Sequence, residues 1–445
     1  MSLHSDDYAI YLPAVNGNYA EDVRKPLEPN RPFPEGLELK DLAFWESDAL
    51  WHYPYILHSA GLFRIGDVPI NGVTARTRST SILLGDSGGF QIGCGTMKGL
   101  KVLHAAAMSA DDAELGWMQE YEAREWIVTW LCDHANYAMT IDIPLWARSK
   151  ARENTPFHNC TPQQLINMTV SNLKFIESRA HGDTKWLNVV QGAESIADIK
   201  LWWDAVKWYR KGGWAMAGTA GAVGGLANML STLLMMRDDG AFEAGQDWVH
   251  VLGVSTPTWA IVLSAIQRAL RTINPALRVS FDSSSPFQIA GRYEEVTLTP
   301  EFTNVAKTWS LRTVKAPQSR LYVDPMSTKP FEHSQSPLGR LLLLNHLNVR
   351  DGKWEPRPFD GVSNLLLANH VIWVYLDAMK TANDLVAAKD ATRVPKRYLD
   401  CVDFIQDVFK RPDWTAAIAA NKPLLDAMAP NRYKGLEDAE KAKAA

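Results

Sequence analysis

Two aspartates in turn-like segments are the residues of this chain best suited to covalent chemistry. Asp86 opens the segment Asp86-Ser87-Gly88-Gly89-Phe90-Gln91, whose two glycines allow a tight turn and bring backbone amides close to a planar ligand. Asp282 heads the segment Asp282-Ser283-Ser284-Ser285-Pro286. Either aspartate alone is also typical of a carboxylate that caps its own turn. At one shared site, the pair suits substitution at a sugar carbon: one carboxylate attacks C1′ while the other handles the leaving group's proton.

Each aspartate ends a short apolar segment that is typical of a buried strand. Six such segments occur, and their near-continuous apolar character indicates strands covered on both faces, as in a parallel sheet. They span residues 80–86, 138–142, 186–191, 213–218, 248–253 and 278–282. Helical segments lie between them. Thr161-Pro162-Gln163-Gln164 combines a capping box with proline at the first helical position and opens a helix to about Arg179, residues 195–211 carry an apolar stripe, and Thr256-Pro257 opens another helix.

Alternating strands and helices predict an α/β fold, either a doubly wound sheet or a (β/α)8 TIM barrel. The strand ends favour the barrel. A doubly wound sheet carries chemistry only near its switch point, whereas a barrel assembles its site from all the loops at one face. Here every predicted strand ends in a polar residue or glycine: Asp86, Asp142, Gln191, Gly218, Gly253 and Asp282.

Composition narrows the remaining classes. The 445 residues are 46% hydrophobic and 22% charged, which excludes collagen, a coiled coil and a mostly disordered chain. No apolar run approaches the roughly 18 residues of a membrane span, and the first residues lack a secretion signal, so we expect a cytoplasmic protein without membrane contact. The four cysteines (Cys94, Cys132, Cys160 and Cys401) are scattered and indicate neither a disulfide framework nor a zinc ribbon.

The predicted domains are a catalytic barrel over residues 1–325 and a mainly helical C-terminal subdomain over 326–445. Helical segments dominate from Val362 onward, over 365–382, 397–409 and 414–428, and residues 437–445 are expected to form a frayed helix or tail. A net charge of −4 excludes a broadly basic coat for nucleic acid but leaves room for a local basic groove.

At the strand ends the chain resembles the tRNA-guanine transglycosylase superfamily. Asp86-Ser87-Gly88-Gly89-Phe90-Gln91 is similar to its D-S-G-G-[FY]-Q signature, and Phe281-Asp282-Ser283 to its F-D-C. Val189-Val190-Gln191-Gly192, the glycine-rich strand at 213–218 and Leu252-Gly253-Val254-Ser255-Thr256-Pro257 follow the family's order, with Asp142 in the place of a base-reading aspartate. The resemblance covers roughly residues 60–292 and is specific because six motifs occur in order.

The resemblance implies a role for each matching residue. Asp282 would attack C1′ of the target nucleotide and release guanine, and Asp86 would shuttle the proton of the departing and incoming bases. Asp142 would accept from the base's N1–H and exocyclic amine. Ser87, Gln191 and the Gly218 backbone would complete this recognition edge, and Phe90 and Leu252 would sandwich the purine, although plain barrel core is an equal reading of those two. Gly88, Gly89 and Gln91 complete the predicted substrate-binding set.

Two departures from the family change the expected substrate. The tRNA enzymes carry C-x-C-x-x-C and a distant histidine that bind structural zinc, whereas the matching stretch here, Phe331-Glu332-His333-Ser334-Gln335-Ser336, has no cysteine. His333, His346 and His370 lack a recognisable ligand spacing, so we predict no zinc and no other cofactor. Pro286-Phe287-Gln288 stands where bacterial tRNA enzymes have P-T-R and an arginine near the anticodon loop. Both departures resemble the phage and bacterial branch that exchanges guanine in DNA for a 7-deazaguanine of the preQ0 type.

The expected partners are therefore DNA and a free 7-deazaguanine base, and the superfamily often forms homodimers. A flipped-out nucleotide needs its phosphates held. The candidates are Lys307, Arg312, Lys315 and Arg320, with Arg393, Lys396 and Arg397 as a second cluster, although a solvated surface is the ordinary reading of each. Three alternatives stay open: a tRNA-guanine transglycosylase, a non-catalytic nucleic-acid-binding paralogue, and a hydrolase on the same barrel.

Overall fold

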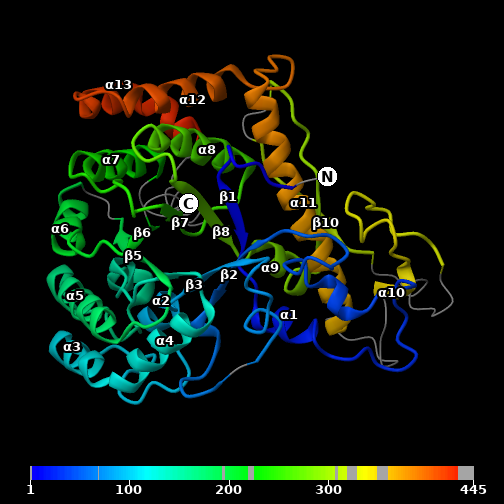
Figure 1. The fold of residues 1–445 in the computed structure, drawn as a ribbon, viewed down its shortest axis with the longest axis horizontal. Helices are drawn as coiled ribbons and strands as arrows, with labels where there is room; N and C mark the ends of the chain where they lie inside the picture. The colour runs from blue at the N-terminus through cyan, green and yellow to red at the C-terminus, as the bar shows by residue number, and fades with distance from the viewer. Residues whose placement is uncertain are drawn as a thin grey trace, which may run out of the picture.

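The computed structural model describes residues 3–68, 70–192, 196–218, 225–305, 309–317, 328–347 and 359–428. Its centre is a sheet of eight parallel strands in the order β1-β8-β7-β6-β5-β4-β3-β2 (Figure 1). The strands are β1 Ile10–Pro13, β2 Tyr55–Ser59, β3 Ile82–Asp86, β4 Tyr137–Met139, β5 Lys185–Gln191, β6 Gly212–Ala217, β7 Trp248–Val251 and β8 Arg278–Ser283. A parallel bridge between Ala14 and Leu57 links the two edge strands, with Val15 N donating to Leu57 O at 2.9 Å. The predicted (β/α)8 barrel is therefore confirmed.

The first two strands, β1 and β2, were absent from the sequence prediction. Both are short, and β2 carries His58, which is fully buried and bonded through Nδ1 to Val15 O at 2.7 Å. A buried histidine interrupts the apolar run that marks the other strands, although its partner makes burial acceptable. The six predicted strands all occur, with ends shifted by up to three residues.

Helices surround the barrel, and capping residues explain where α5 and α8 begin. Thr161 caps α5 through Gln164 N, the two side chains form the expected capping box, and Thr256 caps α8 through Trp259 N at 3.2 Å. The barrel helices are α1 Gly17–Asp22, α2 Gly89–Gly93, α3 Ala110–Gln119, α4 Tyr121–His134, α5 Pro162–Arg179, α6 Ile196–Val206, α7 Gly225–Asp238, α8 Pro257–Arg271 and α9 Ser285–Gly291. Short 3-10 turns occur at Leu39–Leu42, Ala60–Leu62, Leu145–Arg148 and Lys150–Arg152.

The C-terminal helices pack on the outside of the barrel. Helix α11 (Gly361–Ala387) lies against α8 and α9, α12 (Lys396–Val408) against α8, and α13 (Trp414–Met428) against α7, as Figure 1 shows. The short α10 (Leu344–Leu347) also packs on α11, and β9 (Glu295–Leu298) pairs with β10 (Arg312–Lys315) as an antiparallel hairpin outside the barrel. These helices confirm the expected helical C-terminal region. The expected tail at 437–445 lies outside the described residues.

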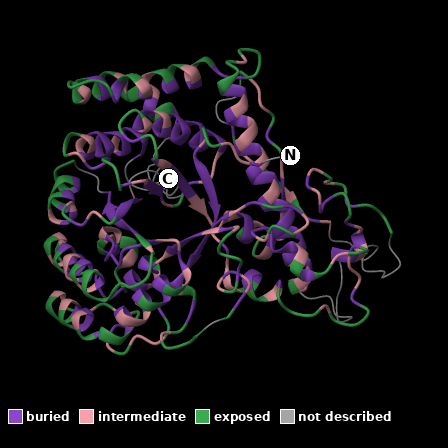
Figure 2. Cartoon of the chain, viewed as in Figure 1, coloured by how far each residue is buried: buried purple, intermediate pink, exposed green. Residues whose placement is uncertain are grey.

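Burial is concentrated in the strands and the inward faces of the helices (Figure 2). Large aromatic side chains contribute much of this core. Seven tryptophans are less than 2% exposed, namely Trp45, Trp117, Trp202, Trp203, Trp214, Trp248 and Trp309. Several of them satisfy their ring N–H, for example Trp202 on Val189 O at 3.0 Å, whereas Trp45 Nε1 has no partner among the described residues. Across the described ranges no helix, α11 included, combines the length and apolar character that crossing a bilayer takes.

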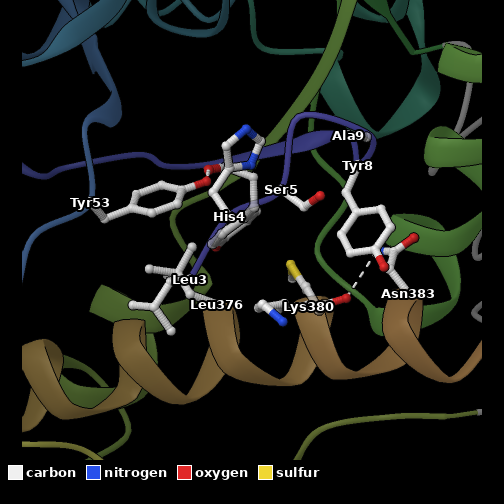
Figure 3. Close-up of a pocket in the computed structure, with 11 residues that line it drawn as sticks. Leu3, His4, Ser5, Tyr8, Ala9, Tyr53, Leu376, Lys380 and Asn383 are labelled. Atoms are coloured by element: carbon white, nitrogen blue, oxygen red, sulfur yellow. Dashed lines mark hydrogen bonds between the residues drawn. The ribbon is translucent and has the colours of Figure 1, made fainter. Parts of the chain in front are cut away.

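The segment before β1 lies toward the end of the barrel opposite the carboxyl ends of the strands. It packs on α11 and encloses a cavity of about 20 Å³ between Tyr8, Lys380 and Asn383 (Figure 3). Tyr8 Oη donates to Asp384 Oδ1 at 2.8 Å and fixes the segment to the helix. This volume is close to that of one water molecule, so the cavity serves packing rather than ligand binding.

Candidate active site

The carboxyl ends of the parallel strands meet at one mouth of the barrel, and the predicted aspartates lie there. Asp86 ends β3 and Asp282 lies near the end of β8, while Asp142 follows β4 by three residues. The three carboxylates interact electrostatically. The negative charge of Asp282 raises the pKa of Asp86, and that of Asp86 raises the pKa of Asp142. The structure thus brings all three carboxylates together, as expected for a barrel site.

Asp282 is held through one oxygen and open at the other. Its Oδ1 accepts from Gly253 N at 3.0 Å and from His250 Nε2 at 3.2 Å. No described residue bonds to Oδ2, and the side chain is 15% exposed. A carboxylate fixed at one oxygen and bare at the other has the geometry of an oriented nucleophile.

His250 was not among the residues predicted from the sequence. It lies in β7 directly opposite Ser280 of β8 and is fully buried. Ser280 Oγ accepts from Trp248 Nε1 at 2.6 Å and lies 2.8 Å from His250 Nδ1. Since the indole only donates, the serine hydrogen is free for Nδ1, which assigns the ring proton to Nε2, facing Asp282. Trp248, Ser280 and His250 therefore form a buried chain that orients the Asp282 carboxylate.

Asp86 lies in a setting that favours a bound proton. Although the residue as a whole is only half-buried, protein atoms surround its carboxyl group, and this burial is the main cause of a raised pKa. The negative charge of Asp282 acts in the same direction, while hydrogen bonds from the Ser59 hydroxyl and from Gly88 N (3.2 Å) oppose it. Ser59 is the register partner of Asp86 on β2, so it was missed along with that strand.

Asp142 forms a polar edge with Gln191 at the end of β5. Gln191 Nε2 donates to Asp142 Oδ2, and both residues are buried. Burial raises the pKa of Asp142 to about 7, the hydrogen bond from Gln191 lowers it, and the charge of Asp86 raises it. A carboxylate beside an amide is able to read a base edge that presents two N–H donors.

Steric contacts explain why glycine occupies positions 88 and 89 of the 86–91 segment. Gly88 has φ +85°, and a side chain there would lie 2.8 Å from the Gly61 Cα. A Cβ on Gly89 would lie 3.0 Å from Asp142 Oδ1. The two glycines therefore allow α2 to begin directly beside the Asp142 carboxylate.

The other predicted substrate-binding residues lie around this edge. Ser87 is buried and donates to Thr140 O at 3.2 Å, and Gln91 is half-buried beside Gly61. Gly218 follows β6 with φ +66°, and residues 219–224 after it lie outside the described residues. Phe90 is 57% exposed, whereas Leu252 packs partly on the core. Their contacts with a base stay predictions.

Of the four predicted phosphate-binding cations, the two that the structure describes have acidic partners away from the mouth. Arg312 and Lys315 lie on β10 of the outer hairpin, paired with Glu301 at 3.7 Å and Glu295 at 3.2 Å. Lys307 and Arg320 lie outside the described residues. Of the second cluster, Arg393 and Lys396 pair with Asp390 and Asp400.

The stretch Phe331–Ser336, compared above with a zinc motif, holds an aromatic and hydroxyl cluster. The Phe331 ring lies 5.3 Å from that of His333 and 5.5 Å from that of His370, and His370 Nδ1 lies 2.8 Å from Ser336 Oγ. A phenyl ring and a hydroxyl are poor zinc ligands, so this donor set does not fit the family's metal. Within the ranges that the structure describes, no group of three or more His, Cys, Asp or Glu side chains is arranged to hold a metal ion.

No protein-family model matches the chain, and no curated protein matches its sequence. The fold and the site together define a (β/α)8 barrel with three interacting carboxylates at the mouth, one of them oriented by a buried histidine.

Proposed function

We propose that the protein is a base-exchange transglycosylase that replaces guanine in DNA with a 7-deazaguanine base of the preQ0 type. The observation that carries this proposal is the contrast between two neighbouring carboxylates. Asp282 is oriented by two N–H donors with its second oxygen bare, whereas burial raises the pKa of Asp86. Neighbouring carboxylates in such different settings are typical of a nucleophile and an acid–base partner.

The exchange takes two balanced displacement steps at C1′. An electron pair of Asp282 Oδ2 forms a bond to C1′ as the bond from C1′ to guanine N9 breaks, and protonated Asp86 gives its proton to the departing guanine. The incoming base then gives the Asp86 carboxylate a proton, and its nitrogen displaces Asp282 from C1′. Nothing is oxidised or reduced, and both carboxyl groups return to their starting states.

Base recognition is proposed to rest on Asp142 and Gln191. Ionised Asp142 would accept from the N1–H and exocyclic amine that guanine and its 7-deaza analogues share. Because the same edge must hold two bases in turn, a reading carboxylate suits exchange better than simple hydrolysis. Reaching C1′ requires the nucleotide to leave the helical stack, at a cost of a few kcal/mol.

DNA is preferred over tRNA for two reasons on the chain. The 331–336 stretch carries no cysteine, and Phe287 and Gln288 of α9 stand where the bacterial tRNA enzymes carry threonine and arginine. Phe287 is buried, its ring 5.3 Å from that of Tyr19, and the exposed Gln288 donates to Ser284 Oγ at 2.8 Å. No cation at this place is offered to an anticodon loop.

The proposal is tested by incubating the protein with labelled guanine or 7-deazaguanines and either duplex DNA or tRNA. Nucleosides are then identified by mass spectrometry. We expect label in DNA, a covalent protein–DNA adduct, and loss of both in Asp282→Asn. Asp86→Asn is expected to abolish exchange without unfolding the protein. Asp377→Asn is the matched control, because burial also raises the pKa of Asp377, which lies on the outer helix α11.

Other outcomes distinguish the alternatives. Label in tRNA alone would identify a tRNA-guanine transglycosylase. Accumulating abasic sites without base incorporation would indicate a hydrolase. An Asp282→Asn variant that retains the full biological effect of the protein would indicate a non-catalytic nucleic-acid-binding paralogue.

A further inference from the structure

An arginine lies over two aromatic rings beside the mouth of the barrel. Arg152 Cζ lies 5.3 Å from the Phe90 ring centroid and 5.0 Å from that of Trp146. The two rings are 5.5 Å apart with an interplanar angle of 36°. The three side chains contact one another and form one cluster, which we name the Arg152 platform.

The platform is joined to the catalytic segments at both ends. Phe90 is the second residue of α2, four residues after Asp86, and Trp146 comes four residues after Asp142. A Cβ on Gly93 would lie 3.1 Å from Trp146 Cη2, so the indole packs directly on α2. The platform therefore borders the Asp86–Asp142 side of the mouth.

The guanidinium of Arg152 has unused hydrogen-bonding capacity. Within the described ranges it has no hydrogen bond and no carboxylate within ion-pair distance, whereas Arg179, which also lies over aromatic rings, pairs with Glu125. Residues 145–153 carry Arg148, Lys150 and Arg152 against one acidic side chain, Glu153. Arg148 and Lys150 are exposed, so this short segment places a local positive charge at the mouth of an acidic protein.

We propose that the Arg152 platform binds the DNA strand next to the exchanged nucleotide, with Arg152 on a backbone phosphate and the Trp146 ring against the neighbouring base. This inference rests on the proposed function, whose target base would lie against the exposed face of Phe90. Arginine donates two parallel N–H groups to phosphate, and an aromatic face stacks with any base. The site explains how a protein with a net charge of −4 holds DNA near its carboxylates.

The chain provides a matched control for this inference. Arg179 on α5 also lies over two rings, 5.6 Å from that of Tyr121 and 5.9 Å from that of Phe175. It differs in position, because it is near the C-terminal end of α5, at the opposite face of the barrel from the mouth, and it pairs with Glu125 at 3.7 Å. Arg179→Gln removes a stacked guanidinium without touching the platform.

The test measures affinity for a fluorescent, guanine-containing oligonucleotide by anisotropy from 50 to 300 mM salt. We expect Arg152→Gln to weaken binding roughly tenfold and to reduce the slope of log affinity against log salt by about 0.7–0.9, the signature of one lost phosphate contact. Trp146→Ala should weaken binding about tenfold with an unchanged slope, because stacking carries no charge. Arg179→Gln should change neither quantity.

Base exchange by the unaltered protein is measured alongside. Exchange together with wild-type affinity and slope in Arg152→Gln would overturn the platform and leave the proposed function standing. No DNA binding and no exchange by the unaltered protein would overturn both. Equal losses of affinity in Arg152→Gln and Arg179→Gln would also overturn the platform, because the loss would then not be specific to the mouth of the barrel.

Discussion

Replacing His250 tests whether the buried chain orients the nucleophile. His250→Phe keeps a ring in a fully buried place but removes one of the two N–H groups that hold Asp282 Oδ1. A hydrogen bond to a charged group contributes about 1.5–3 kcal/mol. If that energy orients Asp282 for attack, the rate of covalent adduct formation falls about 10- to 150-fold. Gly253 N keeps the remaining contact, so the loss is partial.

The assay is single-turnover formation of the protein–DNA adduct, followed on denaturing gels at saturating DNA. The maximal rate should fall while the DNA concentration at half-saturation stays constant, because the hydrogen-bond partners of His250 in the described residues are Ser280 and Asp282, not the proposed base-reading pair Asp142 and Gln191. His250→Gln should recover much of the rate, since its side-chain amide is able to donate to Oδ1. The control is His370→Phe on the outer helix α11, which removes a buried histidine whose Nδ1 is hydrogen-bonded to the Ser336 hydroxyl. It should lower stability and leave the adduct rate unchanged.

Two results would refute this reasoning. One is a folded His250→Phe protein whose adduct rate falls less than threefold. The other is a His250→Gln protein as slow as the phenylalanine variant, because that would assign the loss to packing around Ser280 rather than to the donor.

Three further predictions concern the base edge, the C-terminal region and the metal. Affinity for the free base should fall below pH 7 and be roughly 50-fold weaker at pH 5 than at pH 7, because burial raises the pKa of Asp142 to about 7 and only its ionised form accepts from guanine. Calorimetric titrations measure this affinity, and Asp142→Asn should abolish its pH dependence. Arg31→Met should lower the free energy of unfolding by about 3 kcal/mol in urea titrations, because buried Arg31 binds Asp360 through Nε at 2.7 Å and Nη2 at 2.9 Å; an unchanged midpoint would contradict that. Elemental analysis should find no stoichiometric zinc, because His370 contacts the Phe331 ring and the Ser336 hydroxyl, which are poor zinc ligands; one zinc per chain would overturn this interpretation.

The sequence predicted the barrel because buried parallel strands are apolar throughout and end in recognisable residues. It could not predict the partner of each residue across the sheet. In the sequence, His250 only interrupts an apolar strand. The pairing of β7 with β8 places it opposite Ser280, and its Nε2 lies 3.2 Å from Asp282 Oδ1. Ser59 was hidden for the same reason, since its meeting with Asp86 depends on the pairing of β2 with β3.

Surface charge was harder still to interpret. Local density of lysine and arginine favoured residues 307–320, yet Arg312 and Lys315 pair with acidic neighbours on the hairpin. The Arg152 platform has a single cation, but this cation lies over two aromatic rings and lacks a carboxylate partner within the described ranges. Position relative to the mouth and the absence of a counter-charge decide such cases, and both depend on tertiary structure.

The pairing of β1 with β8 has a consequence for synthesis of the protein. Leu12 is the register partner of Asp282, so the strand that carries this aspartate pairs with a segment that is synthesised much earlier. Some 270 residues separate Leu12 from Asp282 along the chain, and the separation between Arg31 and Asp360 is larger still. Such long-range closure slows folding and leaves nascent strand edges open to misassembly. A chain truncated before β8 would therefore lack both a closed barrel and Asp282.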